Sequence, residues 1–403
     1  MDLSLDYTNK SLKKTGIIIS GSKSESNRLL ILQKLFPNLV LENLSDSDDT
    51  IHLKDALTSE SDTVNIGHAG TAMRFLTAYF ASKPDSHIVL TGSSRMQERP
   101  IQILVNALRD LGASINYANN DGFPPLKITG KTLEKQKVKM KGNVSSQYIS
   151  ALLLIAPSLE NGLEIELEGE ITSAPYLQMT VTLLEKLGVK VDWKGQSIKV
   201  YPKNNIDNCT ITVESDWSSA SYFYSLVALS QNGELNLSAY FKESLQGDSR
   251  LVEIYRAFGV ETTYQENGIT LKKIKDFDLQ PISLNLIEQP DIAQTIAVTC
   301  FGLGIACDLT GLHTLKIKET DRLEALKNEL SKLGAEIFVT DKSLHLKASP
   351  QMNADVLIKT YNDHRMAMAF APLAIKIPIQ IQDAEVVSKS YKHFWRDLDS
   401  VFT

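Results

Sequence analysis

The segment from Lys316 to Leu323 combines residue types that could bind an anion and move a proton. Lys318 and Arg322 lie four positions apart at the start of an expected helix, which Thr320 could cap. Side chains at this spacing face each other, and the positive end of a helix dipole disfavours cations. The pair is therefore favourable when an anion is present, and Glu319 beside it could serve as a general acid or base. The segment predicts a catalytic anion site.

A second polar cluster, from Tyr361 to Ala369, opens another apolar helix. In it Asp363 and His364 could orient Arg365 toward a carboxylate, with which a guanidinium forms strong paired hydrogen bonds. The second half of the chain supplies one more cation and one more carboxylate at a helix start, Lys389 and Asp291. These residues extend the same predicted anion site.

In the first half, the segment from Ser20 to Arg28 follows an apolar strand. Ser22 and Glu25 fit a capping box, so a helix should begin close to Lys23. The free N–H groups of that helix, together with Lys23, Ser24 and Arg28, would suit an anion. The spacing is not that of a P-loop. A well-capped surface helix explains this segment equally well.

Two neighbouring segments carry weaker signals. Gly70 stands among small residues before a probable helix, where a ligand could approach the backbone closely, and Arg74 could support it. Arg95 and Arg99 flank a glutamate a little further on, and there a solvated charged loop is the favoured interpretation.

Hydroxyl and amide side chains open two other expected helices. They are Ser145, Ser146 and Gln147 before the apolar segment 149–156, and Ser173 at the next helix start. Such groups could bind a phosphate and a sugar-like hydroxyl, although plain helix capping explains them slightly better.

An internal repeat indicates the elements that position these residues. Four segments end an apolar helix with a glycine and continue into two short strands, and the glycines are Gly112, Gly188, Gly259 and Gly334. The interval is about 75 residues, and glycine suits the left-handed helix end at each place. The pattern predicts α/β units, two in each half, with a crossing between halves near 213–216.

Composition narrows the class of protein. The chain has 403 residues, enough for two domains, and a net charge of −6, which argues against general nucleic-acid binding. The acidic start is not typical of a signal peptide, and the apolar stretch 292–307 is short for a membrane span. Three cysteines without a paired motif favour a reducing cytoplasm, and histidine spacing predicts no metal site.

The motifs together resemble a known family. Those at 21–28, 69–74, 95–100, 145–147, 290–291, 318–322 and 362–367 are similar, in order and over nearly the whole chain, to the EPSP synthase (3-phosphoshikimate 1-carboxyvinyltransferase) family of enolpyruvyl transferases. The resemblance implies an α/β fold of two similar domains, each of three βαβαββ repeats (an inverse α/β barrel), closing on a substrate cleft. The expected lobes are 16–214, with most of the shikimate 3-phosphate site, and 1–15 with 215–403, with the remaining site residues.

The implied reaction moves the enolpyruvyl group of phosphoenolpyruvate to the 5-hydroxyl of shikimate 3-phosphate. Its products are 5-enolpyruvylshikimate 3-phosphate and phosphate, on the route to chorismate and the aromatic amino acids. The resemblance implies a cytoplasmic monomer that uses no cofactor and has no nucleic-acid or membrane partner.

The family's roles carry over onto matching residues. Asp291, Glu319 and Lys23 would be catalytic, with Lys23, Ser24 and Arg28 as substrate contacts. The implied phosphoenolpyruvate site is Gly70, Arg95, Arg322, Arg365 and Lys389. The implied shikimate 3-phosphate site is Ser145, Ser146, Gln147 and Ser173, joined by Asp291 and Lys318.

The chain differs from the family pattern at two positions, and two alternative functions are considered. Phe75 replaces a frequent proline, which bears on inhibitor sensitivity, and Thr314 replaces an asparagine near the shikimate substrate. The sibling enzyme acting on UDP-N-acetylglucosamine typically uses a cysteine in the N-terminal half, whereas the first cysteine here is Cys209. A non-catalytic anion-binding protein on the same scaffold is the other alternative. It would be expected to lack some of the charged residues, which are all present.

Overall fold

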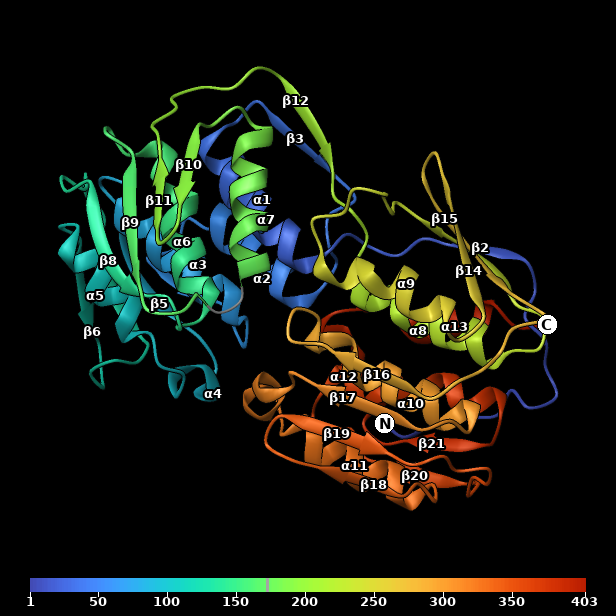
Figure 1. The fold of residues 1–403 in the computed structure, drawn as a ribbon. Helices are drawn as coiled ribbons and strands as arrows, with labels where there is room; N and C mark the ends of the chain where they lie inside the picture. The colour runs from blue at the N-terminus through green and yellow to red at the C-terminus, as the bar shows by residue number, and fades with distance from the viewer. Residues whose placement is uncertain (172–173) are drawn as a thin grey trace. The chain divides into compact units, whose positions relative to one another are not determined.

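The computed structural model describes residues 1–171 and 174–403 and divides them into two compact units (Figure 1). One unit, here called the inserted unit, is 21–213; the other, the split unit, joins 1–20 to 214–403. The expected boundary after residue 15 therefore differs from the observed one after residue 20. The reason is that strand β2 (Thr15–Ile17) pairs with β13 (Glu234–Ser238), which places residues 16–20 with the split unit.

The described strands of the inserted unit form three sheets, with strand orders β4-β5-β7-β6, β8-β9-β11-β10 and β3-β12. In each four-stranded sheet a parallel pair is followed by an antiparallel hairpin. The strands are β3 (Leu39–Glu42), β4 (Thr63–Asn65), β5 (His87–Thr91), β6 (Ser114–Tyr117), β7 (Leu126–Thr129), β8 (Lys137–Lys141), β9 (Leu163–Glu168), β10 (Val191–Lys194), β11 (Ser197–Val200) and β12 (Cys209–Thr212).

The split unit repeats the two four-stranded sheets in its described strands, with orders β2-β13-β15-β14 and β16-β17-β19-β18. Its third sheet, β20-β21-β1, adds the antiparallel strand β1 to a parallel pair. Its other strands are β1 (Leu3–Leu5), β14 (Val260–Gln265), β15 (Gly268–Lys273), β16 (Ile282–Asn285), β17 (Cys307–Thr310), β18 (Ile337–Val339), β19 (Ser343–Leu346), β20 (Val356–Ile358) and β21 (Ile379–Ile381). Two similar units of three repeats each were expected, and this architecture agrees with that expectation.

The repeat glycines have the backbone conformation that the sequence predicts. Gly112, Gly188, Gly259 and Gly334 all have positive φ, at 106°, 71°, 75° and 101°. A residue with a Cβ rarely adopts this backbone conformation. Glycine therefore lets the chain leave a helix and turn directly into the next strand. These glycines follow the outer helices α5 (Gln102–Asp110), α7 (Ala174–Lys186), α9 (Leu251–Arg256) and α11 (Arg322–Lys332).

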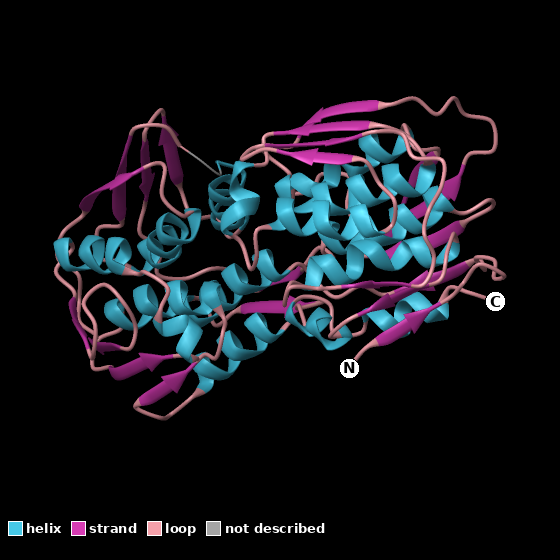
Figure 2. Ribbon diagram, turned by 90° about the horizontal axis from the view of Figure 1, so that it is seen from below, coloured by secondary structure: helices cyan, strands magenta, loops and turns pink. Residues whose placement is uncertain are grey.

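Each unit also contains central helices that are buried on nearly every side. All of α8 (Trp217–Leu229) is buried, as is α3 (Gly70–Ser82) except for its last residue. Helices apolar all round belong in a core, and Figure 2 shows strands lying outside the helices. The other central helices are α1 (Lys23–Leu35), α6 (Ser146–Ile155), α10 (Ala293–Leu303) and α12 (His364–Phe370). The remaining helices are α2 (Asp48–Thr58), α4 (Ser94–Gln97) and α13 (Phe394–Ser400).

The apolar stretch noted in the sequence is accounted for by α10, a buried core helix. Among the helices of residues 1–171 and 174–403, none combines the length and hydrophobicity that crossing a membrane requires.

Candidate active site

In the inserted unit, helix α1 begins at Lys23, as expected. Within the described residues, the side chain of the N-cap Ser22 makes no capping hydrogen bond, so the predicted capping box is wrong in that respect. Lys23 and Ser24 are half-buried, and no ion pair of Lys23 is found in the described part of the chain. A cation in the first helical turn without a carboxylate partner is unfavourable alone. An anionic ligand would relieve this.

Arg28 ties the central helices together. Its guanidinium donates to Thr180 Oγ1 at 2.7 Å, to Ser150 Oγ at 3.2 Å and to the carbonyl of Tyr176 at 3.2 Å. It also stacks over the ring of Phe75, 5.7 Å from the ring centroid. Burial lowers the pKa of Arg28 to about 10. Arg28 thus braces α1 against α6 and α7, and a direct substrate contact for it stays a prediction.

The first turns of α3 and α6 meet in this unit. Gln147 Nε2 donates to Thr71 Oγ1 at 3.3 Å, and each is the second residue of its helix. Ser145 is the exposed N-cap of α6, and among the described residues its side chain forms no capping hydrogen bond. Its hydroxyl is therefore not required by the helix, which weakens the plain-cap alternative. Ser173 lies outside the described residues.

The two arginines near Gly70 are placed differently from each other. Arg95, on α4, is 82% exposed and pairs with Glu98 at 3.0 Å, as in the charged-loop alternative. The guanidinium of Arg99 lies at Gly70, where a Cβ would come within 2.5 Å of Arg99 Nη1. Arg74, buried beneath, donates to the Gly70 carbonyl at 3.0 Å. Burial, with the nearby charge of Arg99, lowers the pKa of Arg74. The start of α3 therefore carries more positive charge than the sequence analysis assigned to it.

In the split unit, Arg322 binds three carboxylates. Its guanidinium donates to Asp363 Oδ2 at 2.7 Å, to Asp291 Oδ1 at 2.9 Å and to Glu319 Oε2 at 2.7 Å. The Arg322 side chain is 2% exposed and that of Asp363 is fully buried. The anion that the sequence analysis required beside Arg322 is thus supplied, in this structure, by the protein itself.

Asp291 is shared among the neighbouring cations. Arg365 Nη2 donates to Asp291 Oδ2 at 3.2 Å, and Lys318 Nζ lies 3.6 Å from Asp291 Oδ1. Burial alone would raise the pKa of Asp291, but the charges of Arg365, Lys318 and Arg322 outweigh it and hold the pKa well below its ordinary value. Asp291 is therefore ionised near neutral pH. The same carboxylate raises the pKa of Arg365 well above its ordinary value, against the effect of burial.

Helix starts position this cluster. Asp291 lies in a short 3-10 turn, Pro290–Ile292, that leads into α10, and Asp363 is the N-cap of α12. Asp363 accepts the backbone N–H of Arg365, while the Arg365 side chain turns to Asp291, so Asp363 orients the backbone rather than the guanidinium. Helix α11 is capped by Asp321, which accepts from the N–H groups of Leu323 and Glu324, and not by Thr320 as expected.

The structure therefore brings one group of predicted residues together within the split unit: Asp291, Lys318, Glu319, Arg322 and Arg365. Lys389 is connected to this group through Asn362, which precedes Asp363. The Lys389 ammonium donates to the carbonyl of Asn362 at 2.7 Å and to Asn362 Oδ1 at 2.9 Å. Thr314, at one of the two departures, has a buried hydroxyl for which the described residues provide no hydrogen-bond partner.

Sequence reasoning assigned Arg99 to a solvated loop and did not identify Asp248. Asp248 accepts a hydrogen bond from Ser218, and burial, with the nearby charge of Asp291, raises its pKa to about 7. No spacing pattern connects Asp248 with residue 291. For Arg99, the available signal was its place in the 95–100 motif that resembles the family, whereas the residues alone favoured an exposed charged loop.

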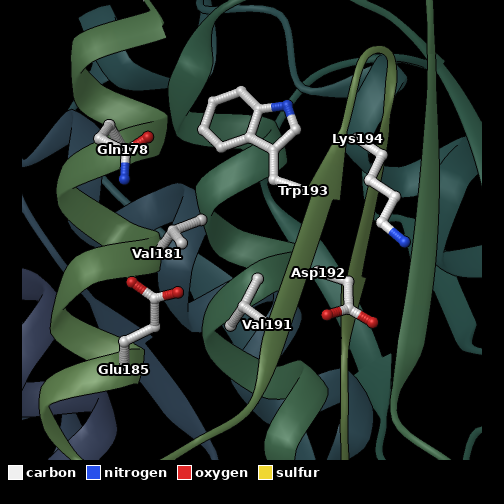
Figure 3. Close-up of a pocket in the computed structure, with 7 residues that line it drawn as sticks. All are labelled: Gln178, Val181, Glu185, Val191, Asp192, Trp193 and Lys194. Atoms are coloured by element: carbon white, nitrogen blue, oxygen red, sulfur yellow. The ribbon is translucent and has the colours of Figure 1, made fainter.

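A hollow elsewhere on the inserted unit does not contain the predicted site. Figure 3 shows it between α7 and β10, with Trp193 and Lys194 on the strand side and Glu185 on the helix side. Its lining residues are Gln178, Val181, Glu185, Val191, Asp192, Trp193 and Lys194. None of them belongs to the predicted motifs.

Comparisons with known proteins bear on this arrangement. A family model described as EPSP synthase (3-phosphoshikimate 1-carboxyvinyltransferase) matches residues 52–398. A 3-phosphoshikimate 1-carboxyvinyltransferase of Bacteroides fragilis (strain YCH46) is 50% identical over 393 residues, covering 96% of this chain and 94% of that relative. One of Haemophilus influenzae (strain PittEE) is 36% identical over 424 residues, covering 96% of each.

Solved structures share the fold. An EPSP synthase from Acinetobacter baumannii superposes with a TM-score of 0.84 at 20% identity, covering 99% of this chain and 98% of that chain. The enolpyruvyl transferase NikO from Streptomyces tendae gives 0.72 at 14% identity, covering 100% and 99%. The expected fold class is thereby confirmed, and by the family match and the near-full-length relatives the chain belongs to the EPSP synthase family.

Proposed function

We propose that this chain transfers the enolpyruvyl group of phosphoenolpyruvate to the 5-hydroxyl of shikimate 3-phosphate, releasing phosphate. The supporting relatives carry the name of this activity, 3-phosphoshikimate 1-carboxyvinyltransferase, at up to 50% identity over nearly the full chain. The observation that carries the proposal is that two carboxylates, Asp291 and Glu319, share the guanidinium of one buried arginine, Arg322. Such a pair can serve proton transfers on one substrate, beside the cations Lys318 and Arg365.

The proposed binding residues follow the family pattern and the geometry within each unit. Shikimate 3-phosphate would contact Lys23, Ser24, Arg28, Ser145, Ser146, Gln147 and Ser173, with Asp291 and Lys318. Phosphoenolpyruvate would contact Gly70, Arg95, Arg322, Arg365 and Lys389. Helix N-termini favour both anions, because free N–H groups and the helix dipole attract negative charge.

The proposed reaction is an addition followed by an elimination. The 5-hydroxyl oxygen bonds to C2 of phosphoenolpyruvate and loses its proton, while C3 gains one, which gives a tetrahedral intermediate. Loss of phosphate from C2 and of a proton from C3 then forms the enol ether. In this scheme Asp291 accepts the hydroxyl proton, and Glu319 gives the proton to C3 and removes it again.

The state of Asp291 suits this role once the substrates are bound. In this structure Arg365, Lys318 and Arg322 keep its pKa well below the ordinary value, so the free carboxylate is a weak base. Substrate anions that compete for the same cations would weaken their hold and make Asp291 more basic. Lys23 and Lys318 would stabilise the charge that develops on phosphate and hydroxyl oxygens.

A single assay tests the proposal against its alternatives. Purified protein is given phosphoenolpyruvate with shikimate 3-phosphate, with UDP-N-acetylglucosamine or with no acceptor, and inorganic phosphate is measured. We expect release only with shikimate 3-phosphate. Release with the UDP-sugar would favour the sibling transferase, and binding of the anions without any release would favour a non-catalytic protein.

Cytoplasmic location and a monomeric state are part of the proposal. The three cysteines, Cys209, Cys300 and Cys307, are free thiols, as suits a reducing compartment. Sedimentation at several protein concentrations tests the oligomeric state, and a mass well above 44.7 kDa would contradict the monomer.

A further inference from the structure

The connection between β20 and α12 has an unusual backbone. Tyr361 and Asn362 both have left-handed conformations, with φ of 54° and 57°, and neither is glycine. The N–H of Asp363 donates to the carbonyl of Thr360 at 2.9 Å, which closes a tight turn around them. Two consecutive left-handed residues with a Cβ are sterically unfavourable, and such turns persist only where the surroundings hold them. The question is which residue does so.

Glu329 holds the chain just before this turn. It is fully buried on α11, and it accepts hydrogen bonds from the Tyr361 hydroxyl at 2.7 Å and from the Lys359 N–H at 2.9 Å. The ammonium of Lys332 also donates to it. Because Glu329 is buried behind its three partners, it does not itself reach a small-molecule substrate.

The same helix holds the chain just after the turn. Arg322, at the start of α11, binds the carboxylate of Asp363. Glu329 follows Arg322 by about two helical turns, so both side chains lie on one face of α11. The segment from Lys359 to Asp363 is therefore fixed at both ends along a single helix.

The turn positions two of the proposed phosphoenolpyruvate ligands. Asn362 accepts two hydrogen bonds from Lys389, through its carbonyl and its side chain, and Asp363 accepts a hydrogen bond from the N–H of Arg365. A rotation at Asn362 would therefore displace the ammonium of Lys389 and the first turn of α12. The conformation of this turn decides where both cations lie.

We propose that Glu329 is a positioning residue for the reaction: by holding Lys359 and Tyr361 it sets the turn that presents Lys389 and Arg365 to phosphoenolpyruvate. This inference rests on the function proposed above. It assigns to Glu329 an effect on one of the two substrates, because the residues it positions belong to the phosphoenolpyruvate site.

The test uses Glu329→Gln and, as a milder variant, Tyr361→Phe. Glutamine keeps the shape of the side chain but removes its negative charge, so its hydrogen bonds with the Lys332 ammonium and the Lys359 N–H become weaker. Glu324→Gln is the matched control, because Glu324 lies on the same helix, is 51% exposed and pairs with Lys327. Steady-state kinetics are measured with each substrate varied in turn.

We expect Glu329→Gln to raise the KM for phosphoenolpyruvate about tenfold, while kcat and the KM for shikimate 3-phosphate change less than about threefold. Tyr361→Phe should act in the same direction and less strongly. The control should match the unaltered protein. Equal changes in both KM values, or an unchanged KM for phosphoenolpyruvate in both variants, would overturn the proposal.

A readout without catalysis separates this inference from the proposed function. Hydrogen exchange at the amides of Lys359 and Asp363 should become faster in Glu329→Gln, while the remainder of α11 keeps its protection. If the unaltered protein releases no phosphate, the proposed function fails, and the exchange comparison still decides whether Glu329 holds the turn. Unchanged exchange at both amides would refute that role.

Discussion

The Arg322 cluster makes a quantitative prediction for the variant Arg322→Met. The substitution keeps an unbranched apolar stem and removes the guanidinium that binds Asp291, Glu319 and Asp363. Hydrogen bonds to charged groups contribute about 1.5–3 kcal/mol each, and exposed pairs much less. Glu319 is 37% exposed, so we count only the two more deeply buried carboxylates. The expected loss is about 3–6 kcal/mol of unfolding free energy, which overlaps the range of about 3–5 kcal/mol for breaking a buried ion pair.

The pH dependence distinguishes lost ion pairs from lost packing. In the unaltered protein the pKa of Asp291 lies well below its ordinary value of 3.8. The contribution of Asp291 to the free energy of unfolding is therefore complete above pH 3.8. It is lost only as the pH falls through the lower pKa of the folded state. Lowering pH from about 7.5 to about 5.5 should leave this contribution unchanged. In Arg322→Met, Asp291 keeps Arg365 and Lys318, but the fully buried Asp363 loses the guanidinium that it binds. Burial then favours the neutral form of that carboxylate, so the variant should regain part of its stability over the same interval.

Urea unfolding followed by circular dichroism at the two pH values measures both effects. Lys327→Met is the control on the same helix, since Lys327 is 41% exposed and pairs with exposed Glu324. It should cost less than about 1 kcal/mol at either pH. A loss in Arg322→Met below about 1 kcal/mol, or a loss that is the same at both pH values, would refute the view that Arg322 neutralises buried carboxylates.

Three further variants test the proposed site. Glu319→Gln should slow phosphate release by about 10²–10⁴-fold with substrate affinities nearly unchanged, as measured by turnover and calorimetry; unchanged turnover would reject its role in proton transfer. Gly70→Ala should displace the guanidinium of Arg99, since the new Cβ would lie 2.5 Å from Arg99 Nη1. It should therefore raise the KM for phosphoenolpyruvate without lowering the melting temperature, and an unaltered KM would show that this helix start does not bind the substrate. Lys23→Met should reduce turnover by about 10²-fold or more. It should leave stability within about 0.5 kcal/mol, and a large stability loss would indicate a structural role.

The sequence predicted the repeats that are continuous in the chain. The glycines at 112, 188, 259 and 334 mark the four sheets that each contain an antiparallel hairpin after an outer helix. The other two sheets lack that signature among the described residues. One is the pair β3 and β12, which are separated by most of the inserted unit, and the other completes β20 and β21 with the N-terminal strand β1. Local pattern cannot reveal strands paired over such separations.

The sequence predicted the charged motifs of the site, but not which carboxylates pair with which cations. The spacing of Lys318 and Arg322 called for an anion, and the structure supplies one from Asp291 and Asp363, which lie far away in sequence. Sequence spacing states that a charge must be balanced, but only the packing of α10, α11 and α12 decides which carboxylate balances it. The same limit explains why Arg99 was assigned to a solvated loop.

The insertion of one unit within the other has a consequence for biosynthesis. Leu3–Leu5 pair with Ile379–Ile381, and Thr15–Ile17 pair with β13, so the first strands leave the ribosome long before their partners exist. The inserted unit, by contrast, is contiguous and can fold while the remainder is still being translated. Strand β2 must then stay unpaired without aggregating until β13 is made, and strand β1 until β21 is made. Closing such a long loop is slow, which makes docking of the N-terminal strands a candidate for the last step in maturation of the split unit.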